Sequence, residues 1–387
     1  MVVMTTLDWQ QLLQDCVSFT QRLIQTPSMS HQEAAIARLI HAEMERLGFD
    51  DVWLDEIGNV CGRIHGQDRA LGTLVLNTHT DHVDPGDPAL WPVPPYSGEI
   101  VDGRILGRGA CDIKGPLAVQ VYSMAALKRA GIRPRRDIVF TGVVQEEIGG
   151  AGSQYWVDHL NYAVDLVVIG EPSGNTLSLG HRGILGLWVT FHGRSVHASV
   201  PHKGVNPNYA LATFLQRLSA NQSRLGSHDL LGPTTVSPTL VQVDTQSKNV
   251  TPAWTRVFLD FRTAVESANS LMAFIAETAA GLDYTIGPGW EGVDIPATDE
   301  PIFGYYTPPD SELVERVSAA LSRGMGRPVA LSSYQFATDG RLFTPRQIPV
   351  VGFAPGEEYL AHTVQESIAI DRMAESLRGY VQLLQEF

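Results

Sequence analysis

The sequence predicts an α/β protein in which a second domain is inserted into the first. Three observations favour this fold class. Apolar strand-like runs alternate with helical patterns up to about residue 180, the pattern changes from Arg182 onward, and the first pattern returns after residue 291. Such alternation is typical of a sheet covered by helices. A chain of 387 residues is also longer than one hydrophobic core usually supports, so two domains are expected.

The first domain begins with helical spacing of apolar residues at 8–25 and 31–47. Strands are then predicted at 52–55, 59–64, 73–77, 137–144 and 165–170, with a helix at 115–130 that ends before Gly131. The last three strands are almost continuously apolar, which suits strands that are buried on both faces. Their helical connections favour a parallel arrangement.

The inserted segment has the order strand, helix, strand, strand, helix, strand, which is that of a complete ferredoxin-like βαββαβ unit. Its elements are predicted at 184–193, 206–220, 234–243, 255–263, 267–281 and 284–288. A unit of this size can fold around its own core. We therefore assign residues 181–291 to the second domain and residues 1–180 and 292–387 to the first. The final part adds a helix at 310–324, a strand at 348–353 and a helix from 371.

Composition excludes several classes of protein. The chain has 42 acidic and 28 basic residues, for a net charge of -14, and this argues against a nucleic-acid partner. No apolar run approaches membrane-spanning length, and the opening residues lack the basic and apolar regions of a signal peptide, so we expect a cytoplasmic protein without a membrane partner. Cys16, Cys61 and Cys111 are scattered and odd in number, which predicts packed thiols rather than disulfides or a zinc clip.

Histidines and acids follow the predicted strands of the first domain. They are His79 and Asp81 after 73–77, Glu146 and Glu147 after 137–144, Glu171 after 165–170 and His362 after 348–353. Asp112 stands between a glycine-rich loop and the start of a helix. The carboxyl ends of parallel strands form one edge of an open sheet, so these side chains are expected to meet there.

Two histidines with several carboxylates form a ligand set that suits zinc, cobalt or manganese, and a carboxylate can bridge two ions. Paired ions are a common device for hydrolysing amides and esters. Glu146 and Glu147 could then divide the work, one binding metal and the other moving protons. Each acid taken alone could instead be a solvated loop residue or a helix cap. Their placement behind strands of one sheet favours a metal site.

A set of motifs carries a resemblance to a known family. The chain resembles the two-zinc amidohydrolases and metallopeptidases that include acetylornithine deacetylase, succinyl-diaminopimelate desuccinylase and carboxypeptidase G2. The motifs are NTHTDHVDPGD, GRGACDIKG, VQEEIGGAGS, IGEPS, GRSVHASVPHKGVNP, KNVTP, ATDGRLF and AHTVQES. The resemblance implies a zinc-peptidase-like catalytic domain with a mixed sheet flanked by helices, and an inserted lid and dimerisation domain.

The resemblance also implies roles for individual residues. His79, Asp112 and Glu171 would hold one ion, and Asp112, Glu147 and His362 would hold the other, with Asp112 bridging the two. Glu146 would be the general base, and Asp81 would brace His79. The Asp112–Ile113 peptide bond would be cis. Cys111 has no ligand role in the family pattern, although a thiolate could in principle bind zinc.

Three residues of the inserted domain are also implicated by the resemblance. His197 would reach the active site of a partner subunit and stabilise the oxyanion there. Asn249 and Arg262 would grip a substrate carboxylate, which suits the fork of an arginine. Two alternatives stay open: Arg262 as an ordinary strand-surface residue, and His197 as a residue that forms hydrogen bonds only within its own domain.

The leading functional hypothesis is a homodimeric amidohydrolase that removes the acyl group from an N-acyl amino acid. It would use two divalent ions, zinc first, with cobalt or manganese as alternatives. A dipeptidase or carboxypeptidase of the same fold, acting on a short peptide, is the first rival. A non-catalytic binding protein is disfavoured, because the proposed base and all five proposed ligands are present together. The acyl group and the amino acid are left open by the sequence.

Overall fold

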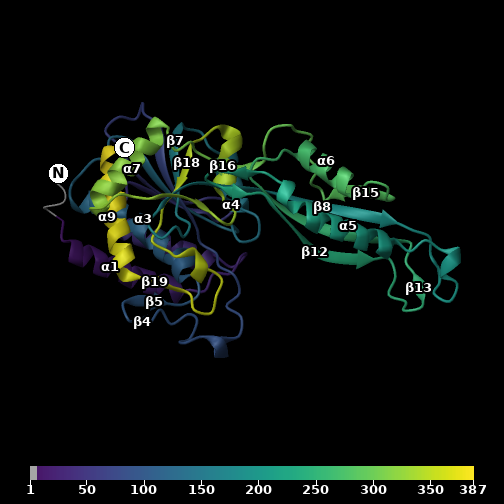
Figure 1. Cartoon of the computed structure of the whole chain (residues 1–387). Helices are drawn as coiled ribbons and strands as arrows, with labels where there is room; N and C mark the ends of the chain where they lie inside the picture. Colours follow the sequence, from purple (N-terminus) through teal and green to yellow (C-terminus); the bar gives the residue numbers. More distant parts are fainter. Residues whose placement is uncertain (1–6) are drawn as a thin grey trace. The chain divides into compact units, whose positions relative to one another are not determined.

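A computed structural model describes residues 7–387, and the chain divides into two compact units (Figure 1). The first unit comprises the chain up to Gly180, Tyr305–Tyr334 and Thr338–Phe387, and the second comprises His181–Gly304 and Gln335–Ala337. Residues 292–304 therefore group with the second unit, although the sequence analysis assigns them to the first domain. The Ile302 amide donates to the Glu266 carbonyl at 2.9 Å, and the Ile302 carbonyl accepts from Thr263 Oγ1 at 2.5 Å. These bonds attach the segment to the second unit.

The sheet of the first unit is mixed, as predicted. Its strand order is β1 (Asp51–Leu54), β2 (Val60–Ile64), β6 (Ile138–Val143), β3 (Thr73–His79), β7 (Val164–Ile169), β18 (Val350–Gly352) and the start of β8 (Leu177–His192). The four strands from β6 to β18 are parallel, whereas β1, β2 and β8 pair antiparallel to their neighbours. Every residue of β3 and β6 is buried, which agrees with their continuous apolar runs.

Helices cover this sheet. They are α1 (Trp9–Ile24), α2 (Ala34–Arg46), α3 (Gly115–Arg129), α4 (Ala151–Asp158), α7 (Glu312–Met325), α8 (Gly340–Phe343) and α9 (Ile370–Glu386). Helix α3 is buried from Gly115 to Leu127 because it packs against β3 and β6 and also against α1 and α9. Helix α7 is capped by Ser311, whose side chain accepts from the Val314 amide, and it ends at Gly326 in the left-handed region.

A small antiparallel sheet in the first unit was not predicted. It consists of β4 (Ile100–Val101), β5 (Arg104–Leu106) and β19 (Ser367–Ala369). Strands of two or three residues carry too little alternation to be recognised from sequence. The pairing of β5 with β19 joins segments more than 250 residues apart in the chain, with Ser367 opposite Leu106. It thereby brings the residues after β5 close to those before β19. The remaining short strand of this unit is β17 (Leu331–Tyr334). Strand β16 (Phe303–Tyr306) spans the point at Gly304 and Tyr305 where the chain passes from the second unit to the first.

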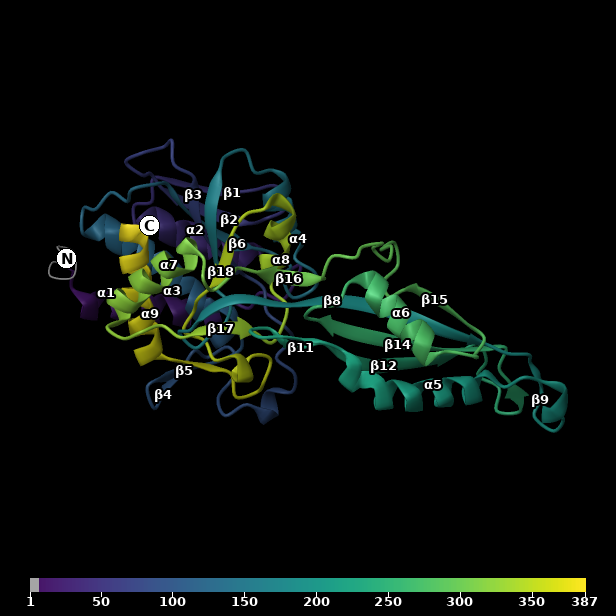
Figure 2. The same ribbon diagram turned by 45° about the horizontal axis from the view of Figure 1, so that its top comes forward.

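The second unit has the predicted βαββαβ order (Figure 2). The elements are β8, α5 (Pro207–Asn221), β12 (Thr235–Val243), β14 (Trp254–Thr263), α6 (Ala268–Thr278) and β15 (Tyr284–Pro288), and the antiparallel sheet order is β15, β8, β14, β12. Alternate residues of β14 are buried, and both helices contribute apolar residues to the same core. Short strands pair at β9 (Val196–His197) with β13 (Val250–Thr251) and at β10 (Ser227–His228) with β11 (Gly232–Pro233).

Between residues 7 and 387, no helix combines the length and the apolar composition needed to cross a membrane.

A buried carboxylate on α2 makes the stability of the first unit depend on pH. Glu43 accepts hydrogen bonds from Tyr122 Oη at 2.6 Å, Arg46 Nη2 at 2.6 Å and Arg22 Nη1 at 3.1 Å. Burial opposes ionisation, but these donors outweigh it and lower the pKa of Glu43 from 4.5 to about 2. The folded-state pKa lies below the unfolded value. The stabilisation is therefore complete above pH 4.5 and is lost as the pH falls toward 2.

We expect Glu43→Gln to lower the free energy of unfolding by about 2 kcal/mol at pH 7, since both arginines are partly exposed and water screens part of the interaction. The difference between the two proteins should shrink by more than half at about pH 3. Urea unfolding of both metal-free proteins at the two pH values measures this. An equal difference at both pH values would contradict the prediction.

Candidate metal centre

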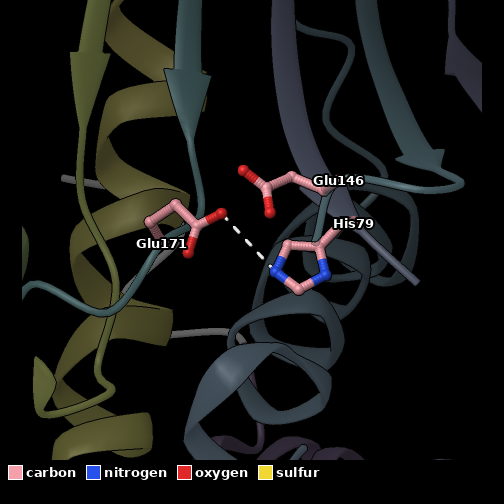
Figure 3. A group of neighbouring side chains, drawn as sticks. All are labelled: His79, Glu146 and Glu171. Atoms are coloured by element: carbon pink, nitrogen blue, oxygen red, sulfur yellow. Dashed lines mark ion pairs between the residues drawn. The ribbon is translucent and has the colours of Figure 1, made fainter. Parts of the chain in front are cut away.

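The predicted ligands of the first unit converge beyond the carboxyl ends of its parallel strands. His79 is the last residue of β3, the pair Glu146–Glu147 follows β6, and Glu171 follows β7. Figure 3 shows His79, Glu146 and Glu171 directed toward one another, and their nearest ligand atoms all lie within 4.8 Å of each other. Parallel neighbours end at the same edge, so the topology places these side chains together.

Asp112 connects the two halves of the cluster. Its Oδ1 lies 3.0 Å from His79 Nε2, which also lies 3.5 Å from Glu171 Oε1. Its Oδ2 lies 3.3 Å from His362 Nε2, which in turn lies 3.1 Å from Glu147 Oε1. One carboxylate thus divides its two oxygens between two histidine–glutamate pairs. The Asp112–Ile113 peptide bond is cis.

The two halves differ in exposure. The side chain of His79 is 1% exposed, whereas that of His362 is 50% exposed. His362 also has a φ of 63°, in the left-handed region that few residues other than glycine adopt. The half of the cluster around Glu147 and His362 therefore faces solvent more than the half around His79 and Glu171.

The negative charge of the clustered carboxylates favours the binding of cations. Burial alone would lower the pKa of His79, but the charges of Glu171, Asp112 and Asp81 outweigh it and raise that pKa well above its usual value. Hydrogen bonds to Asp112 and Glu147 raise the pKa of His362 to about 10. Burial raises the pKa of Glu171. The raised pKa values mean that His79, His362 and Glu171 bind protons tightly in this negatively charged cluster. Metal cations would neutralise the same negative charge and displace those protons. Two histidines with three carboxylates suit zinc, cobalt or manganese, so the residues fit two divalent ions.

Comparison with known proteins identifies the family. Residues 75–386 match the model described as Peptidase family M20/M25/M40. The chain belongs to this family. The predicted family is confirmed, and so is the predicted class of enzyme, a metal-dependent hydrolase of amide or peptide bonds.

Two relatives align with this M20-family enzyme over most of its length. The succinyl-diaminopimelate desuccinylase of Cereibacter sphaeroides (strain KD131 / KCTC 12085) is 29% identical over 388 residues, covering 96% of this chain and 99% of the relative. The uncharacterised protein YgeY of Escherichia coli (strain K12) is 29% identical over 365 residues, covering 91% and 89%.

Solved structures share the fold of this M20-family enzyme. The aminopeptidase PepT of Bacillus cereus superposes with a TM-score of 0.74 at 20% identity, covering 97% of this chain and 98% of that chain. The YxeP protein of Bacillus subtilis, described as a dinuclear metal binding peptidase, superposes with a TM-score of 0.72 at 16% identity, covering 97% and 98%.

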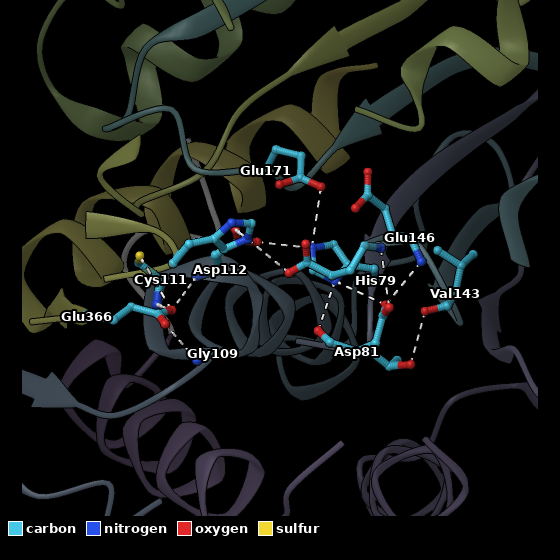
Figure 4. Close-up of polar contacts among 12 residues, drawn as sticks. His79, Asp81, Gly109, Cys111, Asp112, Val143, Glu146, Glu171 and Glu366 are labelled. Atoms are coloured by element: carbon cyan, nitrogen blue, oxygen red, sulfur yellow. Dashed lines mark hydrogen bonds and ion pairs between the residues drawn. The ribbon is translucent and has the colours of Figure 1, made fainter. Parts of the chain in front are cut away.

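Asp81 of the M20-family enzyme contacts more than His79. His79 Nδ1 donates to the backbone carbonyl of Asp81 at 3.0 Å, and Asp81 Oδ1 lies 3.4 Å from the same nitrogen. The side chain of Asp81 also accepts from the backbone amide of Glu146 at 3.1 Å (Figure 4), from that of Glu147 at 3.3 Å and from Ser30 Oγ at 2.7 Å. From sequence, Asp81 was predicted to brace His79 alone. The structure also places it where it fixes the turn that carries the two glutamates.

Two acids near the M20-family site were missed from sequence, although both lie in motifs that carried the resemblance. Glu366 is 1% exposed and accepts hydrogen bonds from the loop that leads to Asp112 (Figure 4). Asp339 is 2% exposed, and its charge adds to the effect of burial in raising the pKa of Glu146. Their place within those motifs is the signal that could have drawn attention to them. Cys111 is free and buried, with a pKa raised by that burial.

The three residues predicted to contact substrate belong to the second unit of the M20-family enzyme. His197 is exposed on β9, and its Nδ1 accepts from the Ser199 amide at 3.1 Å. Asn249 is also exposed, and its carbonyl accepts from the Ala198 amide at 2.8 Å, so Asn249 and His197 lie close together. Arg262 on β14 is engaged elsewhere, because its guanidinium binds Asp260 through Nε at 2.8 Å and Nη2 at 3.3 Å. Their functional roles stay predictions.

Proposed function

We propose that this hydrolase removes the acyl group from an N-acyl amino acid, releasing a carboxylate and a free amine. The observation that carries the proposal is the division of the Asp112 carboxylate between His79 at 3.0 Å and His362 at 3.3 Å. A bridging ligand needs this arrangement, and a solvated loop acid does not. The near full-length alignment with a desuccinylase supports the acyl amino acid over other amides.

In this proposal His79, Asp112 and Glu171 hold one divalent ion, and Asp112, Glu147 and His362 hold the other. Zinc is the first candidate, with cobalt or manganese as alternatives. When bound, such ions would lower the pKa of a water molecule and polarise the carbonyl of the scissile amide.

Glu146 is the proposed general base. It lies within reach of His79 and Glu171 but outside the contacts that join Asp112, Glu147 and His362. Burial and then the charge of Asp339 raise its pKa, so its carboxylate has a higher affinity for a proton than an exposed glutamate. It would take a proton from the attacking water and give it to the nitrogen of the leaving amine. Asp81 would support this role by holding the Glu146 amide at 3.1 Å.

The second unit supplies the proposed substrate contacts and the proposed lid and dimer interface. Ser199 engages His197 through Nδ1, which leaves Nε2 as the nitrogen for the oxyanion, in the active site of a partner subunit. Asn249 would assist from the neighbouring segment. Arg262 would bind the substrate carboxylate only by exchanging its hydrogen bond to Asp260, which is 2.8 Å long.

A panel of substrates tests the proposal against a peptidase of the same fold, a rival supported by the shared fold of PepT. We expect the metal-loaded enzyme to show a kcat/KM about tenfold or more higher for N-acetyl or N-succinyl amino acids than for dipeptides. Higher values for dipeptides or for peptides cut at the C-terminus would favour the rival. Absence of hydrolysis across the whole panel, with both ions bound, would refute the proposal.

A further inference from the structure

A buried ion pair lies beside the ligand cluster without belonging to it. Arg108 and Glu366 are 2% and 1% exposed, and Arg108 Nη1 donates to Glu366 Oε2 at 2.6 Å. Besides a long hydrogen bond from Cys111 Sγ at 3.6 Å, Glu366 accepts three hydrogen bonds from backbone amides. They come from Gly109 at 3.0 Å, Cys111 at 3.1 Å and Asp112 at 3.1 Å (Figure 4). The Glu366 carboxylate therefore provides the hydrogen-bond acceptors for three backbone amides of one turn.

The turn that Glu366 holds cannot satisfy itself by regular helical bonding. Gly109 has a φ of 81°, and Asp112 has a non-helical φ of -126° and ψ of 78°. Buried amides without partners cost considerable free energy, so this path of the chain depends on an acceptor from outside the segment. Because the Asp112 amide is one of the three donors, Glu366 fixes the direction in which the Asp112 side chain leaves the backbone.

Arg108 also contacts the two segments that bear the other proposed ligands, His362 and His79. Its Nη1 also donates to the carbonyl of Thr363, the residue after His362, at 3.3 Å, and its Nη2 donates to the carbonyl of Asp84 at 3.4 Å. The Asp84 segment follows directly from His79 and Asp81. The guanidinium also stacks 5.0 Å above the ring of Trp91, which limits its freedom to turn.

We propose that Glu366 is a positioning residue for the bridging ligand: paired with Arg108, it holds the segments bearing His79, Asp112 and His362 in mutual register before any ion binds. The inference rests on the metal ligands of the proposed function and adds a residue that touches neither an ion nor the substrate. Residues that orient metal ligands commonly contribute about 10-fold to 100-fold to metal affinity.

Glu366→Gln tests the proposal, because the amide keeps the size of the side chain but turns an NH₂ group toward N–H donors. We expect the affinity of the metal-stripped full chain for Zn²⁺ and Co²⁺ to fall about 10-fold to 100-fold, measured by competition with a chromophoric chelator. The visible absorption of the Co²⁺-loaded variant should also differ from that of the wild type, since the geometry of the Asp112 carboxylate changes.

Glu43→Gln is the matched control, because Glu43 is an equally buried carboxylate with two arginine partners, at 2% exposure. It should lose stability while keeping wild-type metal affinity and Co²⁺ absorption. Wild-type affinity and spectrum in Glu366→Gln would overturn the inference, as would equal losses of affinity in the two variants.

A second variant covers the case in which Glu366→Gln does not fold. Arg108→Lys keeps the positive charge but lacks the forked guanidinium group. The lysine side chain therefore cannot reach Glu366, Thr363 and Asp84 together. We expect it to lower metal affinity about tenfold, and unchanged affinity would overturn the inference. A wild-type chain that binds no ion would instead refute the proposed function.

Discussion

Replacing Glu146 with glutamine is expected to lower turnover by about 100-fold or more while both ions stay bound. The substitution removes the proposed general base, which would accept and return a proton, and it leaves the contacts of Asp112, Glu147 and His362 in place. Steady-state kinetics and metal analysis of the same preparation measure the two quantities together. A fall in kcat with little change in KM would indicate that the lost interaction belongs to the transition state.

Glu147→Gln is the matched comparison, since it alters the adjacent residue in the same way. Glu147 lies 3.1 Å from His362, so its loss is expected to weaken the ion on that side and leave close to one ion per chain. Equal metal content in the two variants, or loss of metal from Glu146→Gln alone, would show that the roles of the two glutamates are reversed.

Removal of metal by a chelator is expected to abolish hydrolysis, with a loss of about 1,000-fold or more, because the water and the carbonyl would both lose their activation. Zn²⁺, Co²⁺ or Mn²⁺ should restore activity after the chelator is dialysed away. Mg²⁺ should restore far less, since it prefers oxygen ligands and the cluster includes two histidines.

The control for metal removal is a check that the metal-stripped protein remains folded. The sheet edge positions the ligands without ions, so the stripped protein should keep its far-UV circular dichroism and its cooperative unfolding. Full turnover by exhaustively metal-free protein would contradict both the prediction and the proposed function.

The parts of the site that lie on long strands could be predicted from sequence. Buried parallel strands have a continuous apolar signal, and polar residues behind them must meet at one edge, so His79, Glu146, Glu147 and Glu171 were placed by pattern alone. His362 and Asp112 lie on irregular segments; their approach to the same edge was expected from the strand before His362 and the helix after Asp112, and the family motifs assigned their individual roles. Glu366 was missed because three of its partners are backbone amides, which leave no trace in a side-chain pattern, and its partner Arg108 is more than 250 residues away in the chain.

Other features depended on contacts between distant segments. The pairing of β5 with β19 involves three residues on each side and could not be read from either segment alone. The engagement of Arg262 by Asp260 could have been foreseen, since residues i and i+2 of a strand lie on the same face. The extent of the second unit was underestimated, because the bonds of Ile302 to Thr263 and Glu266 have no signature in sequence.

The position of β18 in the sheet has a consequence for biosynthesis. This strand lies between β7 and β8, although it is formed only at Val350–Gly352, whereas His181–Gly304 is a continuous stretch made much earlier. During translation the second unit can complete its core while the sheet of the first unit still has a gap beside β7. His362 and Glu366 leave the ribosome later still. The nascent chain therefore carries an incomplete set of the proposed ligands until His362 has been made, and the second proposed ion should bind only after that point.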